Sequence, residues 1–189
     1  MPYFICLLVM FLTAAPVLAD AERYVLQREQ SRVGFTYWFG ANSDTGTMPV
    51  STADLWIDLN RPQNSSVDVT LDAHGARTGF FAATQALRGE SILHTRAFPF
   101  IRFRSTRITP QGDGARVEGD VTIRGVIRPL TLEARFFRPV GTALGDHDNL
   151  VILLSGSISR SNFGADGFAD QVGDTVNIRI LAHMRRVGI

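Results

Sequence analysis

Apolar side chains alternate with charged or hydroxylated ones along most of this chain. This period of two is typical of β-strands that turn one face to a core and the other to water. It recurs in eight runs, at residues 33–39, 53–59, 67–72, 101–104, 117–123, 130–136, 150–159 and 176–182. The run 150–159 alternates least, so we expect it to be the most buried strand. The pattern predicts an antiparallel sheet.

Short connections between the runs favour closure of this sheet into a barrel. Gly112-Asp113-Gly114 is a strong hairpin signal, and Gly125 and Pro129 bracket another short connection. Sequential antiparallel strands must close or stack to protect their edges, and short hairpins favour an up-and-down barrel over a sandwich. We predict an all-β fold, an eight-stranded antiparallel barrel with room inside for side chains or one slender ligand. An outer-membrane barrel would place the polar positions inside its lumen. The Arg, Asp and Glu side chains at these positions are too bulky for the lumen of an eight-stranded barrel, which argues against that alternative.

The segment 78–94 departs from the alternation. Its apolar and hydroxylated residues fit a period of 3.6, carried by Phe80, Phe81, Thr84, Leu87 and Ile92. Gly89 interrupts that period, so we predict a helical insert of one or two short helices. No internal repeat or linker-like stretch divides the chain, and one domain is the simplest organisation.

The N-terminal segment is typical of an export signal. Residues 3–18 are an apolar run without charged side chains, and the run closes with Val17-Leu18-Ala19. We predict a signal peptide at 1–19, cleaved after Ala19, and a mature domain at 20–189. An uncleaved membrane anchor is the alternative, but a spanning helix needs roughly 20 apolar residues. Cys6, the sole cysteine, lies in this segment, so the mature domain is expected to have no thiol or disulfide.

Charge excludes one class of partner. The 19 cationic side chains are all arginine, and 18 acidic side chains nearly balance them. Because the charges are spread along the chain, the sequence argues against a nucleic-acid or anionic-membrane surface.

Catalytic and metal-binding patterns are weak. His74, His94, His147 and His183 are scattered, without the spacing that places two metal ligands on one helix face. Asp146-His147-Asp148 could hold a metal weakly, although a solvated loop is the better interpretation. The sequence has no Gly-x-Ser-x-Gly elbow and no phosphate-cradling glycine loop. We therefore predict a protein that is not an enzyme and uses no cofactor or metal, with an enzyme acting on a bound lipid as the lesser alternative.

Three stretches resemble the YceI-like family in order and spacing. They are residues 98–106, residues 117–132 and residues 158–164 with 172–176. The middle stretch is fairly specific, with Thr122-Ile123-Arg124-Gly125 at the end of one strand and Pro129 at the start of the next. The resemblance covers about residues 23–184, nearly the whole mature chain.

The resemblance implies a lipocalin-like barrel in the bacterial periplasm that holds a polyisoprenoid or another long amphiphile and binds rather than catalyses. This sequence departs from the family pattern in its first third. Gln30-Ser31 and residues 37–40 stand where the family tends to show histidines, and Gly46-Thr47-Met48 replaces the usual Gly-x-Phe. If those histidines help to bind a head group, the choice of head group differs here.

Aromatic and aliphatic residues on the inward parity or on the insert are the candidates for contact with such a ligand. For any one of the aromatic residues, a place in the core without ligand contact is the favoured alternative. The predicted ligand-binding residues are Phe35, Tyr37, Phe39, Leu55, Ile57, Phe80, Phe81, Leu87, Ile101, Phe103, Leu132, Phe136, Phe163 and Ile178.

Three polar residues, Arg160, Asn162 and Asp174, follow or precede apolar strands in the third stretch. They could contact a ligand head group at the barrel mouth. A hydrogen-bonded corner between strand and loop is the favoured alternative.

The sequence as a whole predicts a periplasmic binding or carrier protein for a polyisoprenoid, a quinone or a fatty-acid-like lipid, without nucleic-acid binding or stable membrane insertion. The alternative is a lipid-free partner of a membrane redox protein, with the barrel filled by side chains. Whether the protein forms a homodimer is left open by the sequence.

Overall fold

A single antiparallel sheet forms most of the protein. The computed structural model describes residues 21–137 and 146–188, and the predicted signal peptide at 1–19 lies outside them. The strands are β1 (Glu22–Leu26), β2 (Arg32–Phe39), β3 (Asn42–Met48), β4 (Val50–Ile57), β5 (Ser66–Asp72), β6 (Arg77–Thr78), β7 (Phe100–Gln111), β8 (Gly114–Ile123), β9 (Val126–Phe137), β10 (Asn149–Ser159) and β11 (Thr175–Arg186). One α-helix, α1 (Phe81–Arg88), and two 3-10 turns, η1 (Pro62–Asn64) and η2 (Arg160–Phe163), complete the described elements.

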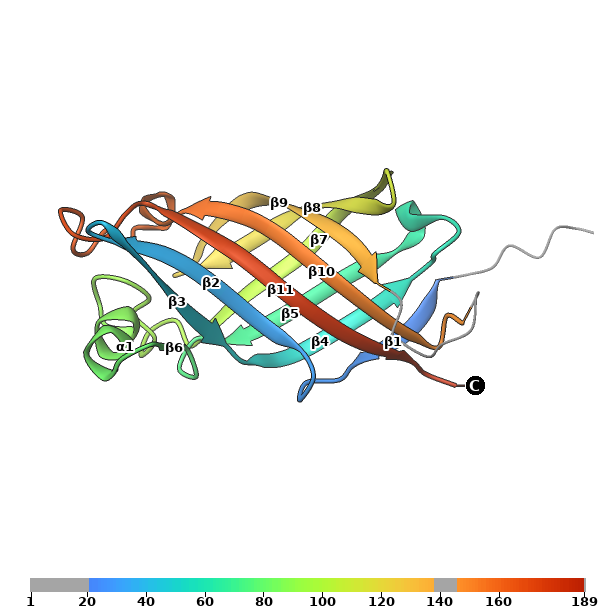
Figure 1. Ribbon diagram of the computed structural model, residues 1–189, viewed down its shortest axis with the longest axis horizontal. Helices are drawn as coiled ribbons and strands as arrows, with labels where there is room; N and C mark the ends of the chain where they lie inside the picture. The colour runs from blue at the N-terminus through green and yellow to red at the C-terminus, as the bar shows by residue number, and fades with distance from the viewer. Residues whose placement is uncertain (1–20, 138–145, 189) are drawn as a thin grey trace, which may run out of the picture.

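The sheet closes into a ring of eight strands, which confirms the predicted barrel and its short helical insert. The ring runs β1-β4-β5-β7-β8-β9-β10-β11, and β11 pairs again with β1. The C-terminal part of β11 pairs with β1, and its N-terminal part pairs with β2. β2 pairs in turn with β3, which is followed directly by Pro49 and β4. The strands cross the long axis of the molecule obliquely, with α1 at one end and the C-terminus at the other (Figure 1).

The eight alternating runs overlap β2, β4, β5 and β7 to β11, whereas β1, β3 and the two-residue β6 were not predicted. The first is only five residues long. The second has the sequence Asn-Ser-Asp-Thr-Gly-Thr-Met, which is rich in residues that propensity assigns to turns. It is a strand because β2 pairs with it over seven positions, from Val33↔Met48 to Phe39↔Asn42.

Two inward-facing glycines make room for aromatic rings beside the barrel wall. A Cβ on Gly46 would lie 2.1 Å from Cζ of Phe35, and one on Gly119 would lie 2.6 Å from Cζ of Phe103. Contacts this short cannot exist, so both rings lie against bare backbone. The rings of Phe35 and Phe103 therefore lie close to the barrel wall and leave the centre of the interior open.

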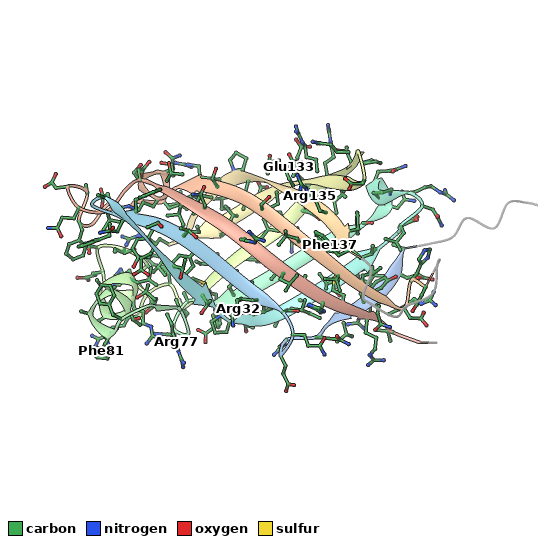
Figure 2. All side chains as sticks on the ribbon, viewed as in Figure 1. Arg32, Arg77, Phe81, Glu133, Arg135 and Phe137 are labelled. Atoms are coloured by element: carbon green, nitrogen blue, oxygen red, sulfur yellow. The ribbon has the colours of Figure 1, made fainter. Side chains whose placement is uncertain are left out.

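The outward parity also follows the prediction. Glu133, Arg135 and Phe137 of β9 project from the outside of the barrel, as does Arg32 of β2 (Figure 2). Within the described residues, no helix is long and apolar enough to cross a membrane.

The connection between β10 and β11 is held by the buried side chain of Arg160, which is 7% exposed. Its Nε donates to the carbonyl of Gly173 at 3.0 Å, Nη2 to that of Val172 at 2.7 Å, and Nη1 to those of Gly167, at 2.8 Å, and Ala165. One side chain therefore satisfies the buried carbonyls of a loop that has few regular hydrogen bonds.

Replacing Arg160 with Met should destabilise the protein by about 3 kcal/mol, because it removes these donors and leaves buried carbonyls without partners. The free energy of unfolding in urea measures the effect. Arg32→Met, on the exposed outer face of β2, is the matched control and should change stability by less than about 0.5 kcal/mol. Equal effects of the two substitutions would show that the Arg160 network does not stabilise the fold.

Candidate functional site

The barrel encloses a cavity of about 960 Å³. Every strand of the ring contributes to its lining, from Leu26 of β1 to Met184 of β11. The lining reaches Pro62 and Gly112 at one end of the barrel and Phe80 and Val172 at the other. Its volume is near the top of the range of about 300–1,000 Å³ for ligand pockets. The site is therefore a long lumen rather than a cleft on the surface.

The predicted ligand-binding residues line this lumen with one exception. The lining includes Phe35, Tyr37, Phe39, Leu55, Ile57, Phe80, Leu87, Ile101, Phe103, Leu132, Phe136, Phe163 and Ile178. Alternation identified the strand positions because side-chain parity in a closed barrel separates inside from outside. Whether each residue contacts a ligand remains a prediction.

Phe81 does not line the lumen. The residue is 77% exposed, and its side chain lies on the outside of the molecule at the α1 end (Figure 2). The neighbouring Phe80 is in extended conformation at the N-cap of α1 and does line the lumen, although it is 55% exposed. The helical period could not distinguish the two, because it carries no information on where the helix begins.

Several residues that line the lumen were not predicted from the sequence. Small residues of the helix, Ala82, Ala83 and Ala86, face the lumen, but alanine carries little signal in a hydrophobic pattern. Leu154 and Ile158 of β10 also line it. They lie in the run with the weakest alternation, where parity did not identify the inward face.

Asp58 is a carboxylate at the η1 end of the lumen. The alternation of residues 53–59 predicts it on the water-facing side, but β4 ends at Ile57 and Asp58 is 4% exposed. Its carboxylate accepts hydrogen bonds from the backbone N–H groups of Arg61 at 2.8 Å and Asn60 at 3.0 Å, and from Nδ2 of Asn64 at 3.3 Å. The Arg61 N–H is the main cause that holds the pKa of this carboxyl below its usual range. These bonds shape the turn before β5.

A second polar group lies at the α1 end. The hydroxyl of Tyr37 donates to Oδ2 of Asp44 across the β2–β3 pair, at 3.0 Å. Desolvation by burial, followed by the hydrogen bond to Asp44, raises the pKa of Tyr37 to about 12. Thr78 also lines this end, and its hydroxyl lies 3.1 Å from that of Thr84 on α1. The two ends of an otherwise apolar lumen thus differ in chemistry.

The stretch with Arg160, Asn162 and Asp174 forms a hydrogen-bonded corner. The carboxylate of Asp174 accepts from the hydroxyl of Ser159 and, at 2.9 Å, from the N–H of Ser161. The Ser159 hydroxyl is the main cause that lowers the pKa of Asp174. Arg160 also lines the lumen, but four of its N–H groups are bound to loop carbonyls.

In residues 21–137 and 146–188, no group of three or more His, Cys, Asp or Glu side chains is arranged to hold a metal ion. Asp146-His147-Asp148 forms part of the approach to β10, where the carboxylate of Asp146 accepts from the N–H of Asp148 and Asp148 pairs with Arg186.

The barrel and its lumen can now be compared with known proteins. The model of the YceI-like domain matches residues 24–184. The chain belongs to the YceI-like family. A UPF0312 protein of Yersinia pestis is 26% identical over 132 residues, and that alignment covers 67% of this chain and 66% of the relative. A UPF0312 protein of Shewanella putrefaciens is 28% identical over 124 residues, with 64% and 65% covered. The alignments thus span slightly less than two thirds of the length of these relatives.

Solved structures of low sequence identity share the family fold. BcnA of Burkholderia cenocepacia superposes with a TM-score of 0.74 over 84% of this chain and 99% of its own, at 18% identity. The YceI protein of Campylobacter jejuni gives a TM-score of 0.61 over 73% of this chain and 81% of its own, at 19% identity. These similarities show the barrel and carry no information on a ligand.

Tyr37 in the lumen lining and Tyr24 in the core give a test of how strongly these two hydroxyls are buried. Desolvation by burial, then the charge of Glu22, also raises the pKa of Tyr24 to about 12. Because the pKa of both groups is above the ordinary value of about 10, their contribution to stability is complete below pH 10. It is lost as the pH rises from 10 to about 12.

Ultraviolet absorbance should show tyrosinate forming near pH 12 in the folded protein, and the free energy of unfolding should fall across the same window. Tyr37→Phe should remove part of that fall. Tyrosinate formation near pH 10 in the folded state would show that water reaches both hydroxyls.

Proposed function

We propose that this protein binds and carries a long apolar amphiphile inside its barrel, in the class of polyisoprenoids, quinones and fatty-acid-like lipids. The observation that carries the proposal is the elongated lumen of about 960 Å³, walled by inward-facing aliphatic and aromatic side chains of all eight ring strands. The membership in the YceI-like family supports it.

The energetics of apolar burial require a long ligand. Each buried CH₂ contributes about 0.8 kcal/mol, and association costs at least about 4 kcal/mol. A chain of about 15 carbons would gain about 12 kcal/mol and retain at most about 8 kcal/mol, which corresponds to micromolar affinity at best. A chain of five carbons would barely offset the cost. An elongated lumen therefore suits a long-chain ligand, because a short apolar chain would bind too weakly.

The protein acts, in this proposal, as a non-catalytic carrier in the periplasm. The apolar run before Ala19 supports export and cleavage at that position. Three charged residues of the described part of the chain line the lumen. Asp58 and Arg160 are engaged in structural hydrogen bonds, and Asp113 is exposed in the β7–β8 turn, which supports a binding role over acid–base chemistry.

Native mass spectrometry of the protein from a periplasmic extract, prepared without added lipid, tests the proposal. A stoichiometric adduct that extracts into organic solvent is the expected result, on a chain that begins at Asp20. A bare chain that also fails to take up quinones and polyprenols would contradict the carrier function. That outcome would favour a lipid-free partner of a membrane protein.

A blocking substitution separates ligand binding from folding. Ala53 of β4 lines the lumen, and Ala53→Phe adds a ring where the ligand chain would lie. Binding should weaken by about tenfold or more, while the barrel stays folded because the ring enters existing space. Thr52→Phe, on the exposed opposite face of the same strand, is the matched control and should bind normally. Equal binding by the two variants would place the ligand outside the lumen.

A further inference from the structure

The polar group at the α1 end of the lumen has an unusual balance of hydrogen-bond donors and acceptors. It consists of Tyr37 on β2, Asp44 on β3, Thr78 on β6 and Thr84 on α1, and we call it the Tyr37 cluster. Tyr37 and Thr78 line the lumen. Asp44 stands opposite Tyr37 in the β2–β3 register and beside Gly79, where a Cβ would lie 3.2 Å from Oδ1 of Asp44.

The hydroxyls of this cluster that line the lumen have acceptors within the protein. The single hydrogen of Tyr37 points to Asp44, since that carboxylate can only accept. The Thr78 hydroxyl lies 3.2 Å from the carbonyl of Phe80 and 3.1 Å from the hydroxyl of Thr84, and either can accept its hydrogen. The backbone N–H of Thr78 donates to Thr84 at 3.0 Å. The two hydroxyls that line the lumen, those of Tyr37 and Thr78, therefore have protein acceptors for their hydrogens, and Thr84 does not belong to the lining.

Acceptor capacity, by contrast, remains. The phenol oxygen of Tyr37 has two lone pairs, and Thr78 is the neighbouring side chain that hydrogen-bonds to one of them. The carboxylate of Asp44 also has free lone pairs, because it accepts one bond at each oxygen, from Tyr37 and from the N–H of Thr45. An anionic head group would be repelled by Asp44 and would find no donor in the cluster. A head group that carries its own O–H would complete it.

We propose that the Tyr37 cluster receives the head group of the bound amphiphile and accepts a hydrogen bond from it. The protein therefore selects long-chain amphiphiles with an uncharged, hydrogen-bond-donating head, such as an alcohol or a hydroquinone. It discriminates against acceptor-only heads, such as an ether or a quinone, and against phosphate esters. This selectivity rests on the proposed carrier function and names the class of ligand.

Two other groups at this end are weaker competitors for the head group. Arg160 has four N–H groups bound to loop carbonyls, which leaves one of its five uncommitted. Gln171 also lines the lumen, but it is exposed, and water therefore competes for its amide. A preference for phosphate would identify Arg160 as the head-group residue instead.

Four probes that share one isoprenoid chain of about 20 carbons test the proposal: the alcohol, its methyl ether, its monophosphate and the hydrocarbon without a head. Dissociation constants come from native mass spectrometry titrations of the purified full chain. We expect the alcohol to bind about 3- to 10-fold more tightly than the ether, the value of one hydrogen bond. The phosphate should bind more weakly than the alcohol by at least the same factor.

Tyr37→Phe should reduce the preference for alcohol over ether to about one and leave the affinity for the hydrocarbon unchanged. Tyr24→Phe is the matched control, because the Tyr24 hydroxyl is bound to the carbonyl of His147 at 2.8 Å and does not belong to the cavity lining; it should keep the wild-type preference. Asp44→Asn introduces an amide donor and should shift the preference toward the ether, which gives a second measurement if Tyr37→Phe folds poorly.

The outcomes distinguish the two proposals. If the alcohol, ether and hydrocarbon bind equally, the carrier function stands and the head-group selectivity is wrong. A preference for the phosphate, or a preference for the alcohol that survives both Tyr37→Phe and Asp44→Asn, also overturns the selectivity. If no probe binds, the carrier function fails and the selectivity with it.

Discussion

Pairing between the first and last strands of the barrel is the interaction on which the lumen depends. The register Tyr24↔Arg186 brings β1 and β11 together, and the side chains reinforce it. Arg186 pairs with Glu22 at 2.8 Å, and the Tyr24 hydroxyl, on a side chain 1% exposed, binds the carbonyl of His147. Closure removes the exposed edges of β1 and β11 where the two strands pair. It also converts the inward face of the sheet, which an open sheet would have to cover with another layer, into the wall of a cavity.

A closed eight-stranded barrel does not by itself leave an empty interior, since side chains can fill one of this size. Here the volume is kept by small residues at inward positions. Gly46 and Gly119 let the rings of Phe35 and Phe103 lie against the wall, and Ala115, Ala134 and Ala182 are buried positions of the lining with little volume. The alternation of apolar and polar residues therefore produces the barrel, whereas the small size of several inward residues leaves a cavity inside it.

The polar residues at the lumen divide into structural and available groups. Asp58 shapes the turn at one end and Arg160 holds the β10–β11 connection at the other, each through several hydrogen bonds. Tyr37 and Asp44 differ because their hydrogen bond leaves acceptor lone pairs free. A largely apolar lumen with an acceptor cluster at one end favours a long, uncharged, hydroxyl-bearing ligand, since a head group without a donor would lose its hydrogen bonds to water there without replacement by the cluster.

The sequence by itself determined eight of the strands, the inward and outward faces of most of them, the helical insert and the closed barrel, because a side-chain period of two is read directly from residue order. It also placed Phe35, Phe103 and Leu132 in the lumen wall. Tertiary structure decided the rest. Only pairing with β2 made a strand of the polar segment β3, and only the start of α1 placed Phe80 in the wall and Phe81 outside it. The joining of Tyr37 and Asp44 with Thr78 and Thr84 depends on four separate elements meeting at one end of the barrel. Parity states which face a side chain is on, but the volume left inside and the partner of each polar atom follow from how distant segments pack.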